Sequence, residues 1–150
     1  MANDTQILED RKSNLLQDLE TERASYLLNA RLNYFGAQGM SWLSLAASGL
    51  AAFLGLVPSS VDKSVVGGLA LLSTGLIAAS RQLGLQQKAN WHYRKVDRLK
   101  TLRNRLLYEL PTSPDANNIA AISSAKSTMD TDMSKEWEDM QHDTKTRPKT

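Results

Sequence analysis

Hydrophobic residues are concentrated in the middle third of the chain, in two runs at 39–57 and 64–80. The first run has no charged residue, and none occurs anywhere between Arg31 and Asp62. As α-helices the runs would measure roughly 28 and 26 Å at about 1.5 Å per residue, close to the ~30 Å hydrocarbon core of a bilayer. The second helix extends over 64–85 if the Arg81 side chain reaches back to the headgroups. The pattern therefore predicts two membrane-spanning helices.

A helical hairpin buried inside a soluble bundle is the alternative interpretation. A soluble helix of this length normally carries charge on its solvent face, and neither run does so. The short segment 58–63 contains Pro58, which ends the first helix, and Ser60 or Asp62 can cap the second. So short a connection forces the two helices to be antiparallel. We expect an all-α membrane protein built on a two-span antiparallel transmembrane hairpin, with 58–63 as its outer loop.

Three flanking segments, 5–38, 86–110 and 115–140, carry apolar residues at helical spacing. The stripes comprise Leu8, Leu15, Leu19 and Tyr26, then Val96, Leu99, Leu102, Leu106 and Leu110, then Ile122, Met129, Met133, Trp137 and Met140. We expect three amphipathic helices, the last capped by Asp115, followed by a flexible polar tail at 141–150. Each stripe needs a packing partner, either in the same chain or in a neighbouring subunit.

Positive charge is distributed unevenly around the predicted spans. Eight Lys and Arg residues and one acid, Asp97, lie between Arg81 and Arg105, whereas the loop between the spans has only Lys63. This bias predicts that both termini are cytoplasmic and that the protein lies in the cell's inner (plasma) membrane. The candidate headgroup or topology residues are Arg81, Lys88, Arg94, Lys95 and Arg98, and the candidate interfacial aromatics are Trp42, Trp91 and Tyr93. No base-reading motif accompanies the basic run, so nucleic acid is not expected as a partner.

Small residues share faces on both predicted spans. The candidates for packing of the spans or for lining a pore are Ser41, Ser44, Ser48, Gly68, Gly75 and Ala79. Small side chains let helix backbones approach closely in lipid, and packing is their commoner use. A pore would use the serines as a weakly hydrated wall.

The composition offers little catalytic chemistry. The chain has no cysteine, and its two histidines, His92 and His142, are not spaced as metal ligands. No nucleophile or nucleotide-binding motif occurs, so we expect neither an enzyme nor a cofactor. His92 could sense pH, although an ordinary interfacial residue is the favoured interpretation. The polar, acidic first 30 residues do not resemble a signal peptide.

Several segments resemble the SLATT family of two-span membrane proteins. The matching features are the sequences 30–32 (Ala-Arg-Leu) and 88–94 (Lys-Ala-Asn-Trp-His-Tyr-Arg), the Gly, Ala and Ser-rich spans, the Leu-rich helix ending at Tyr108-Glu109, and Trp137. The resemblance covers most of the chain. It implies an effector of nucleotide-signalling or anti-phage systems that oligomerises and permeabilises the membrane when a separate sensor or signalling protein detects infection.

The functional hypothesis is therefore a self-assembling membrane effector, a homo-oligomer in the lipid bilayer that belongs to a defence or cell-suicide system. A non-pore membrane anchor or adaptor, which would recruit a cytoplasmic partner through its amphipathic stripes, is the first alternative. A phage holin is the second, since small two-span proteins with basic tails share this pattern. The stripes flanking the spans make a holin less attractive.

Overall fold

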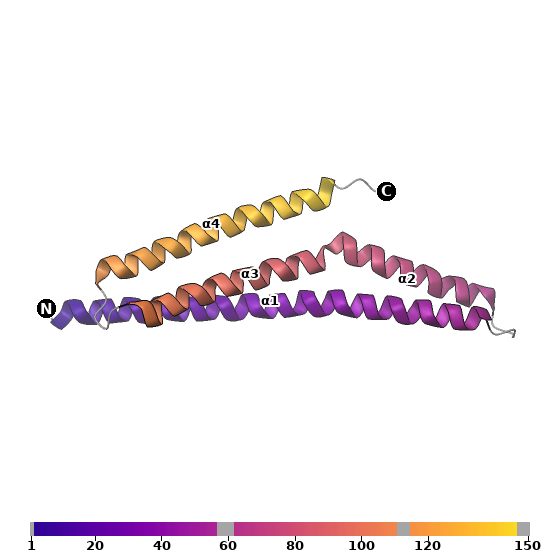
Figure 1. Cartoon of the computed structure of the whole chain (residues 1–150), viewed down its shortest axis with the longest axis horizontal. Coiled ribbons are helices and arrows are strands. Elements are labelled where there is room, and N and C mark those ends of the chain that lie inside the picture. The colour runs from indigo at the N-terminus through magenta and orange to yellow at the C-terminus, as the bar shows by residue number, and fades with distance from the viewer. Residues whose placement is uncertain (1, 57–61, 111–114, 147–150) are drawn as a thin grey trace. The chain divides into compact units, whose positions relative to one another are not determined.

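The computed structural model describes residues 2–56, 62–110 and 115–146, and the described residues form helices joined by short breaks (Figure 1). The elements are α1 (Ala2–Leu56), α2 (Lys63–Leu83), α3 (Leu85–Asn104), the π-helical turn η1 (Arg105–Glu109) and α4 (Ala116–Thr146). The described ranges contain no strand. The predicted all-α class is confirmed.

Two helical stretches, Thr5–Leu56 and Lys63–Glu109, are long and apolar enough to cross a membrane. Each contains one of the two apolar runs identified in the sequence. The first run is the C-terminal part of α1, which continues without a break through Gly36 and Gly39. The segment expected at 5–38 and the first apolar run thus form one helix.

The ends of the helices follow local chemistry. The Asp62 carboxylate accepts a hydrogen bond from the Ser64 backbone N–H (3.0 Å) and caps α2, as the sequence allowed. Asp115 accepts one from the Asn118 N–H (2.7 Å) at the start of α4, as predicted. At the other end of α2, Gly84 adopts a left-handed conformation (φ 60°), and its N–H donates to the Arg81 carbonyl. Glycine populates this region without a Cβ penalty, so α2 ends at Leu83 rather than at the expected 85.

Two other predicted boundaries differ from the structure or lie outside it. Helix α4 continues to Thr146, so residues 141–146, expected to be a flexible tail, are helical. The predicted turn around Pro58 and Ser60, and the break between Pro111 and Pro114, lie outside the described residues.

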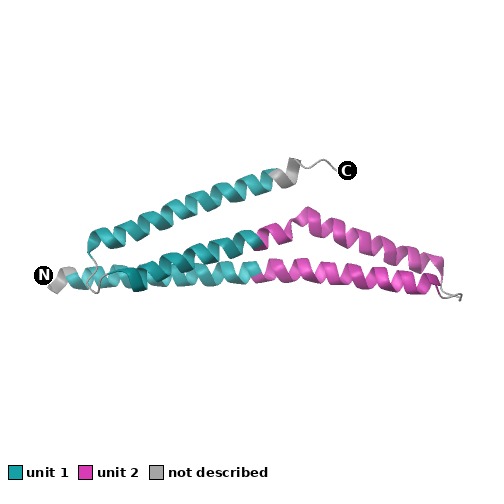
Figure 2. Cartoon of the chain, viewed as in Figure 1, with its two compact units in different colours: residues 1–30, 90–150 teal, residues 31–89 magenta. Residues whose placement is uncertain are grey.

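The chain divides into two compact units (Figure 2). Residues 31–89 form one unit, called here the helix pair, made of the second half of α1 together with α2 and the start of α3. Residues 1–30 and 90–150 form the other, called here the three-helix unit, made of the start of α1, most of α3, and α4.

Within the helix pair, α1 and α2 run antiparallel. Three contacts define the register. A Cβ at Gly36 would lie 3.6 Å from Leu85, and one at Gly55 would lie 3.9 Å from Val66. Between these two levels, the Ser44 and Ser73 hydroxyls are 2.9 Å apart. The residues of α1 closer to Leu56 therefore lie beside the residues of α2 closer to Lys63.

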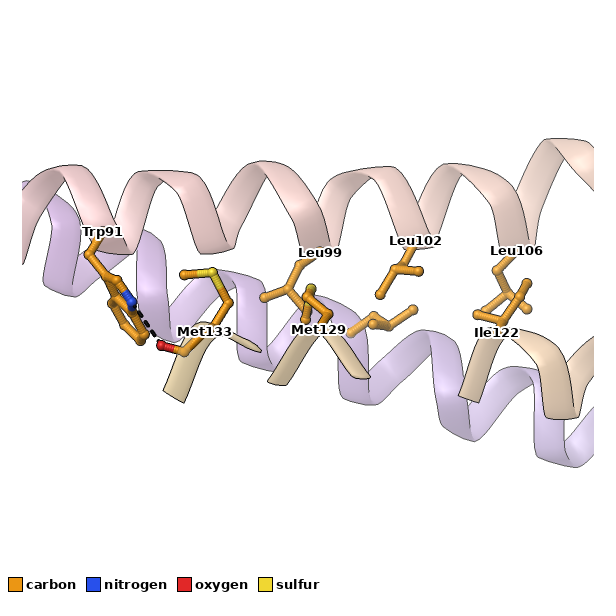
Figure 3. Close-up of a cluster of buried hydrophobic side chains, with 8 residues drawn as sticks. Trp91, Leu99, Leu102, Leu106, Ile122, Met129 and Met133 are labelled. Carbon is orange, nitrogen blue, oxygen red and sulfur yellow. Dashed lines mark hydrogen bonds between the residues drawn. The ribbon is translucent and has the colours of Figure 1, made fainter. Parts of the chain in front are cut away.

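The three-helix unit is built around an apolar core (Figure 3). The core residues are Leu19 from α1, Trp91, Leu99 and Leu102 from α3, Leu106 from η1, and Ile122, Met129 and Met133 from α4. Most of these belong to the three stripes seen in the sequence. The stripes therefore pack on one another within a single chain, and burial of their apolar surface stabilises the unit.

Candidate functional site

Large apolar side chains are exposed mainly on the helix pair. Among the described residues, 17 large hydrophobic side chains are exposed, and 14 of them lie between residues 31 and 89. Examples are Trp42 (68% exposed) on α1 and Leu71 (76%) on α2. Soluble proteins rarely leave a contiguous apolar surface of this kind open to water. Lipid is the environment that such a surface fits.

The polar groups of the helix pair are turned inward instead. Ser73 is buried between the helices, and its hydroxyl lies 2.9 Å from the hydroxyls of both Ser44 and Ser48. The Ser44 hydroxyl also lies 3.1 Å from the Ser73 carbonyl oxygen and can donate to it. Three hydroxyls thus hydrogen-bond with one another at the contact between the helices, which offsets the cost of burying Ser44 and Ser73. Ser73 was not among the residues singled out from the sequence.

The remaining small residues proposed from the sequence lie outside this contact. The Ser41 hydroxyl donates to the Ala37 carbonyl of its own helix (3.0 Å). Gly68 and Gly75 are exposed, and a Cβ at either would meet no atom within 4 Å. Ala79 is half-buried. At 100° per residue, Gly68 and Gly75 point away from the side of α2 that carries Ser73.

A buried lysine organises the charges of the three-helix unit. Lys95 of α3 is only 6% exposed. Its ammonium lies 3.1 Å from Glu22 of α1 and 3.0 Å from Asp130 of α4, and it donates to the Tyr26 hydroxyl (3.0 Å). Lys126 of α4 contacts the second oxygen of both acids, at 2.8 Å from Glu22 and 3.3 Å from Asp130. Two cations and two anions alternate in a ring, called here the charge ring, that joins all three helices.

The ionised groups in this ring favour the ionisation of their partners. Burial by itself would lower the pKa of Lys95, but its hydrogen bonds to Tyr26, Asp130 and Glu22 outweigh burial and raise that pKa above its ordinary value. Burial would raise the pKa of Asp130, yet Lys95 and Lys126 lower it. The Glu22 carboxylate raises the pKa of Lys126. Lys95, Lys126 and Asp130 are therefore charged near neutral pH.

An aromatic cluster adjoins the charge ring. The Trp91 indole N–H donates to the Met133 carbonyl (3.1 Å; Figure 3), and its ring centroid lies 4.7 Å from that of Trp137. Tyr26 and His92 contact the same indole, with centroids at 5.8 and 5.0 Å. His92 Nδ1 is buried without a hydrogen-bond partner in the described part of the chain. Burial, and then the nearby Lys95 charge, lower the pKa of His92.

Several residues expected at a membrane interface have other surroundings in the structure. Trp91 and Lys95 are buried in the three-helix unit, so neither side chain is free to meet headgroups, and Tyr93 is half-buried there. Arg94 and Arg98 are exposed but both pair with Glu136, at 3.3 and 3.1 Å. The sequence contained a signal for this pairing, since residues 130–139 include five acids and only one base, Lys135.

Two of the predicted headgroup residues remain available, along with one predicted interfacial aromatic. Arg81 is exposed and Lys88 half-buried, and neither has an ion pair within the described ranges. Trp42 is exposed on the helix pair. These three residues keep the environment that a membrane interface requires.

The described residues contain no group of three or more His, Asp and Glu side chains that could hold a metal ion. No protein-family model, curated protein or solved structure matches this chain. A function is therefore proposed from the chain's own residues and their contacts.

Proposed function

We propose that the protein is a membrane-embedded effector that self-assembles and permeabilises the inner (plasma) membrane. In this proposal the helix pair is a transmembrane hairpin, α1 from residue 39 onward and α2 being its two spans, and both termini are cytoplasmic. The observation that carries the proposal is the exposed apolar surface of the helix pair, which places 14 large hydrophobic side chains where only lipid or protein suits them. Helix α2 has 21 residues and measures about 31 Å, enough to cross a bilayer.

The open glycine face of α2 supports self-assembly. Gly67, Gly68 and Gly75 have no neighbour within 4 Å of a Cβ position, and they point away from α1. In lipid, helices associate mainly where small residues let their backbones come close. A second copy of the hairpin would gain this contact, and the resemblance to two-span effectors favours the same conclusion.

The polar lining of a conducting assembly would come from exposed hydroxyls. Ser44, Ser48 and Ser73 hydrogen-bond with one another at the contact between the helices, so their hydroxyls are already engaged. Ser41 and Thr74 are exposed and donate only to carbonyls of their own helices, which leaves their oxygens able to accept hydrogen bonds from water. The three-helix unit would then hold the assembly or receive a signal from a separate sensor protein.

Dye leakage from proteoliposomes, paired with the mass of the detergent-solubilised assembly, tests this proposal. The wild-type protein should release dye and run as an oligomer. The double variant Gly68→Leu/Gly75→Leu should release much less and shift toward the monomer, because leucine keeps neighbouring backbones apart. Ala70→Leu places a leucine at an exposed site on the flank of α2 instead, and it should leak like the wild type.

A non-conducting membrane anchor is the second candidate, and the hydrogen bonds of the serines with one another favour it. The anchor would recruit a cytoplasmic protein and would leave liposomes intact at every protein density. Wild-type liposomes that stay sealed, together with a monomeric mass, would exclude the effector and leave the anchor. If the Gly68→Leu/Gly75→Leu variant leaks as much as the wild type, the glycine face is not the assembly surface, although the protein still permeabilises the membrane.

A further inference from the structure

Two groups of cations can be distinguished among those that surround the apolar runs. Arg94, Lys95, Arg98, Arg103 and Arg105 each have an acidic partner within the three-helix unit. Arg31, Arg81 and Lys88 belong to the helix pair, and within the described ranges they form no ion pair. The sequence of the helix pair contains one acid, Asp62, next to Lys63. Three cations are therefore left without a counter-charge of their own.

These three cations lie at the same end of the helix pair. Gly36 lies level with Leu85, so Arg31, five residues before Gly36, and Lys88, three residues after Leu85, both lie about a turn beyond that level. Arg81 lies about one turn from that level in the opposite direction, directly after the apolar run 64–80. Asp62 caps the opposite end of α2. The charge of the helix pair is thus concentrated at one rim, called here the cation rim (Arg31, Arg81 and Lys88).

Exposed aromatic side chains mark the depth of this rim. Phe35 and Trp42 of α1 are both about two-thirds exposed, and the antiparallel register places them on either side of the level of Arg81. Tyr34 contacts Phe35 edge to face, with ring centroids 5.8 Å apart. Such aromatic side chains prefer the boundary between hydrocarbon and headgroups. The cation rim therefore coincides with the level at which lipid phosphates lie.

We propose that Arg31, Arg81 and Lys88 bind the headgroups of anionic phospholipids. The guanidinium groups match phosphate oxygens geometrically, and the Lys88 ammonium adds a point charge. The inference rests on the membrane insertion proposed above but not on permeabilisation. Headgroup anions would supply the counter-charge that this rim lacks. Five other cations of the basic run, Arg94, Lys95, Arg98, Arg103 and Arg105, are already paired with acids of α1, η1 and α4.

Quenching of tryptophan fluorescence by brominated lipid tests the proposal on the full chain. The protein is reconstituted in equal parts of phosphatidylcholine and phosphatidylglycerol, with brominated acyl chains on one lipid or on the other. Trp42 reports the lipid beside the rim, while Trp91 and Trp137, both in the three-helix unit, add a background signal. From the quenching, the association constant of the protein for phosphatidylglycerol should be at least about five times its association constant for phosphatidylcholine. This is the factor expected for one interfacial charge.

Two triple variants with equal charge loss separate the cation rim from net charge. Arg31→Gln/Arg81→Gln/Lys88→Gln should bring the ratio of association constants close to one. Arg94→Gln/Arg98→Gln/Arg103→Gln removes three cations that already have acidic partners, and it should keep the wild-type ratio. Equal loss in both variants would overturn the proposal, as would equal quenching by the two lipids in the wild type.

The remaining outcomes distinguish this inference from the proposed function. A wild-type protein quenched by neither lipid is not embedded, which overturns both proposals. Preference for the anionic lipid without dye leakage supports the cation rim and counts against permeabilisation. If the rim variant does not reconstitute, two further measurements test the proposal: the single variant Arg81→Gln, and the wild type in added salt. Each should lower the ratio of the two association constants if charge causes the preference for the anionic lipid.

Discussion

The helix pair and the three-helix unit are built from the same helices, α1 and α3, yet they distribute polarity in opposite ways. The three-helix unit buries Leu99, Leu106 and Met133 completely and keeps charged side chains at its surface, several of them in ion pairs. The helix pair exposes its large apolar side chains and buries Ser44 and Ser73. A single uninterrupted helix can therefore serve two environments, because the side chains along it, not its backbone, determine which surroundings it requires.

The two regions should also differ in what stabilises them. In water, burial of apolar surface drives the packing of the three-helix unit. In the proposed membrane location that driving force is absent between helices, so the helix pair would depend on close packing and on its hydroxyl contacts. Truncating a core side chain should therefore cost much more in the first region than removing a hydroxyl costs in the second.

The largest effect is expected for Trp91→Ala in the three-helix unit. This change removes the contacts with Tyr26 and Trp137 and the hydrogen bond to the Met133 carbonyl. It should lower the free energy of unfolding of the unit by about 3–5 kcal/mol. Faster hydrogen exchange in α4 would report the loss. Tyr108→Ala is the control, since this side chain is 77% exposed and its loss should change the exchange rate in α4 little. Similar exchange rates in the two variants would contradict the importance of this core.

The charge ring should give the next largest effect. Lys95→Met leaves Glu22 and Asp130 facing each other with Lys126 as their shared cation. Because both acids remain partly exposed, we expect a loss of about 2–3 kcal/mol, at or below the range for breaking a buried pair. Chemical denaturation monitored by circular dichroism measures it. Arg94→Gln breaks an exposed pair and should cost about 1 kcal/mol or less, and an equal cost for the two variants would refute the special role of Lys95.

In the helix pair, Ser73→Ala removes both interhelical hydroxyl contacts at once. The expected loss is about 0.5–1.5 kcal/mol, the size measured for hydrogen bonds between helices in lipid. Thermal unfolding in detergent micelles measures this loss. Thr74→Ala is the matched control, since that hydroxyl donates only within its own helix, to the Ala70 carbonyl (3.1 Å). Equal losses would show that the serine contact contributes nothing to pairing.

The smallest effect is a dependence of the three-helix unit on pH. The pKa of His92 is lowered below its ordinary 6.5 by burial and by Lys95, while Tyr26, Trp91 and Trp137 surround the ring. The unfolded chain then binds the proton more tightly than the folded chain. Stability should be complete above about pH 6.5 and should fall as the pH drops through the lowered pKa.

His92→Gln should flatten this part of the stability profile, and His142→Gln should leave it as in the wild type. Denaturation midpoints measured between about pH 5 and 8 decide this, the range in which an ordinary histidine titrates. A profile that keeps its slope in His92→Gln would assign the dependence to another group.

The sequence predicted the parts of the fold that depend on periodicity and local chemistry. Leu99, Leu102 and Met133 lie in stripes that are visible without coordinates, and Asp62 and Asp115 cap helices as their positions suggested. The two apolar runs were equally visible, because a helix that faces water rarely continues for nineteen residues without a charge.

What the sequence did not reveal depends on which helices meet. Lys95 looked like one more cation of a basic run, and only the convergence of α1, α3 and α4 places Glu22 and Asp130 beside it. Trp91 looked interfacial because it lies soon after the second apolar run, yet it packs against Trp137, which is 46 residues away. The serine contact likewise needed the register of α1 against α2, which places Ser73 opposite Ser44 and Ser48.

The three-helix unit is assembled from the first 30 residues and the last 61, with the helix pair between them in the sequence. A nascent chain leaving the ribosome therefore exposes Leu19 long before Met133 exists to cover it. Both apolar runs are likewise synthesised before Met129 and Met133. A premature stop codon before α4 would consequently leave both apolar runs intact but present an open leucine stripe to chaperones and proteases.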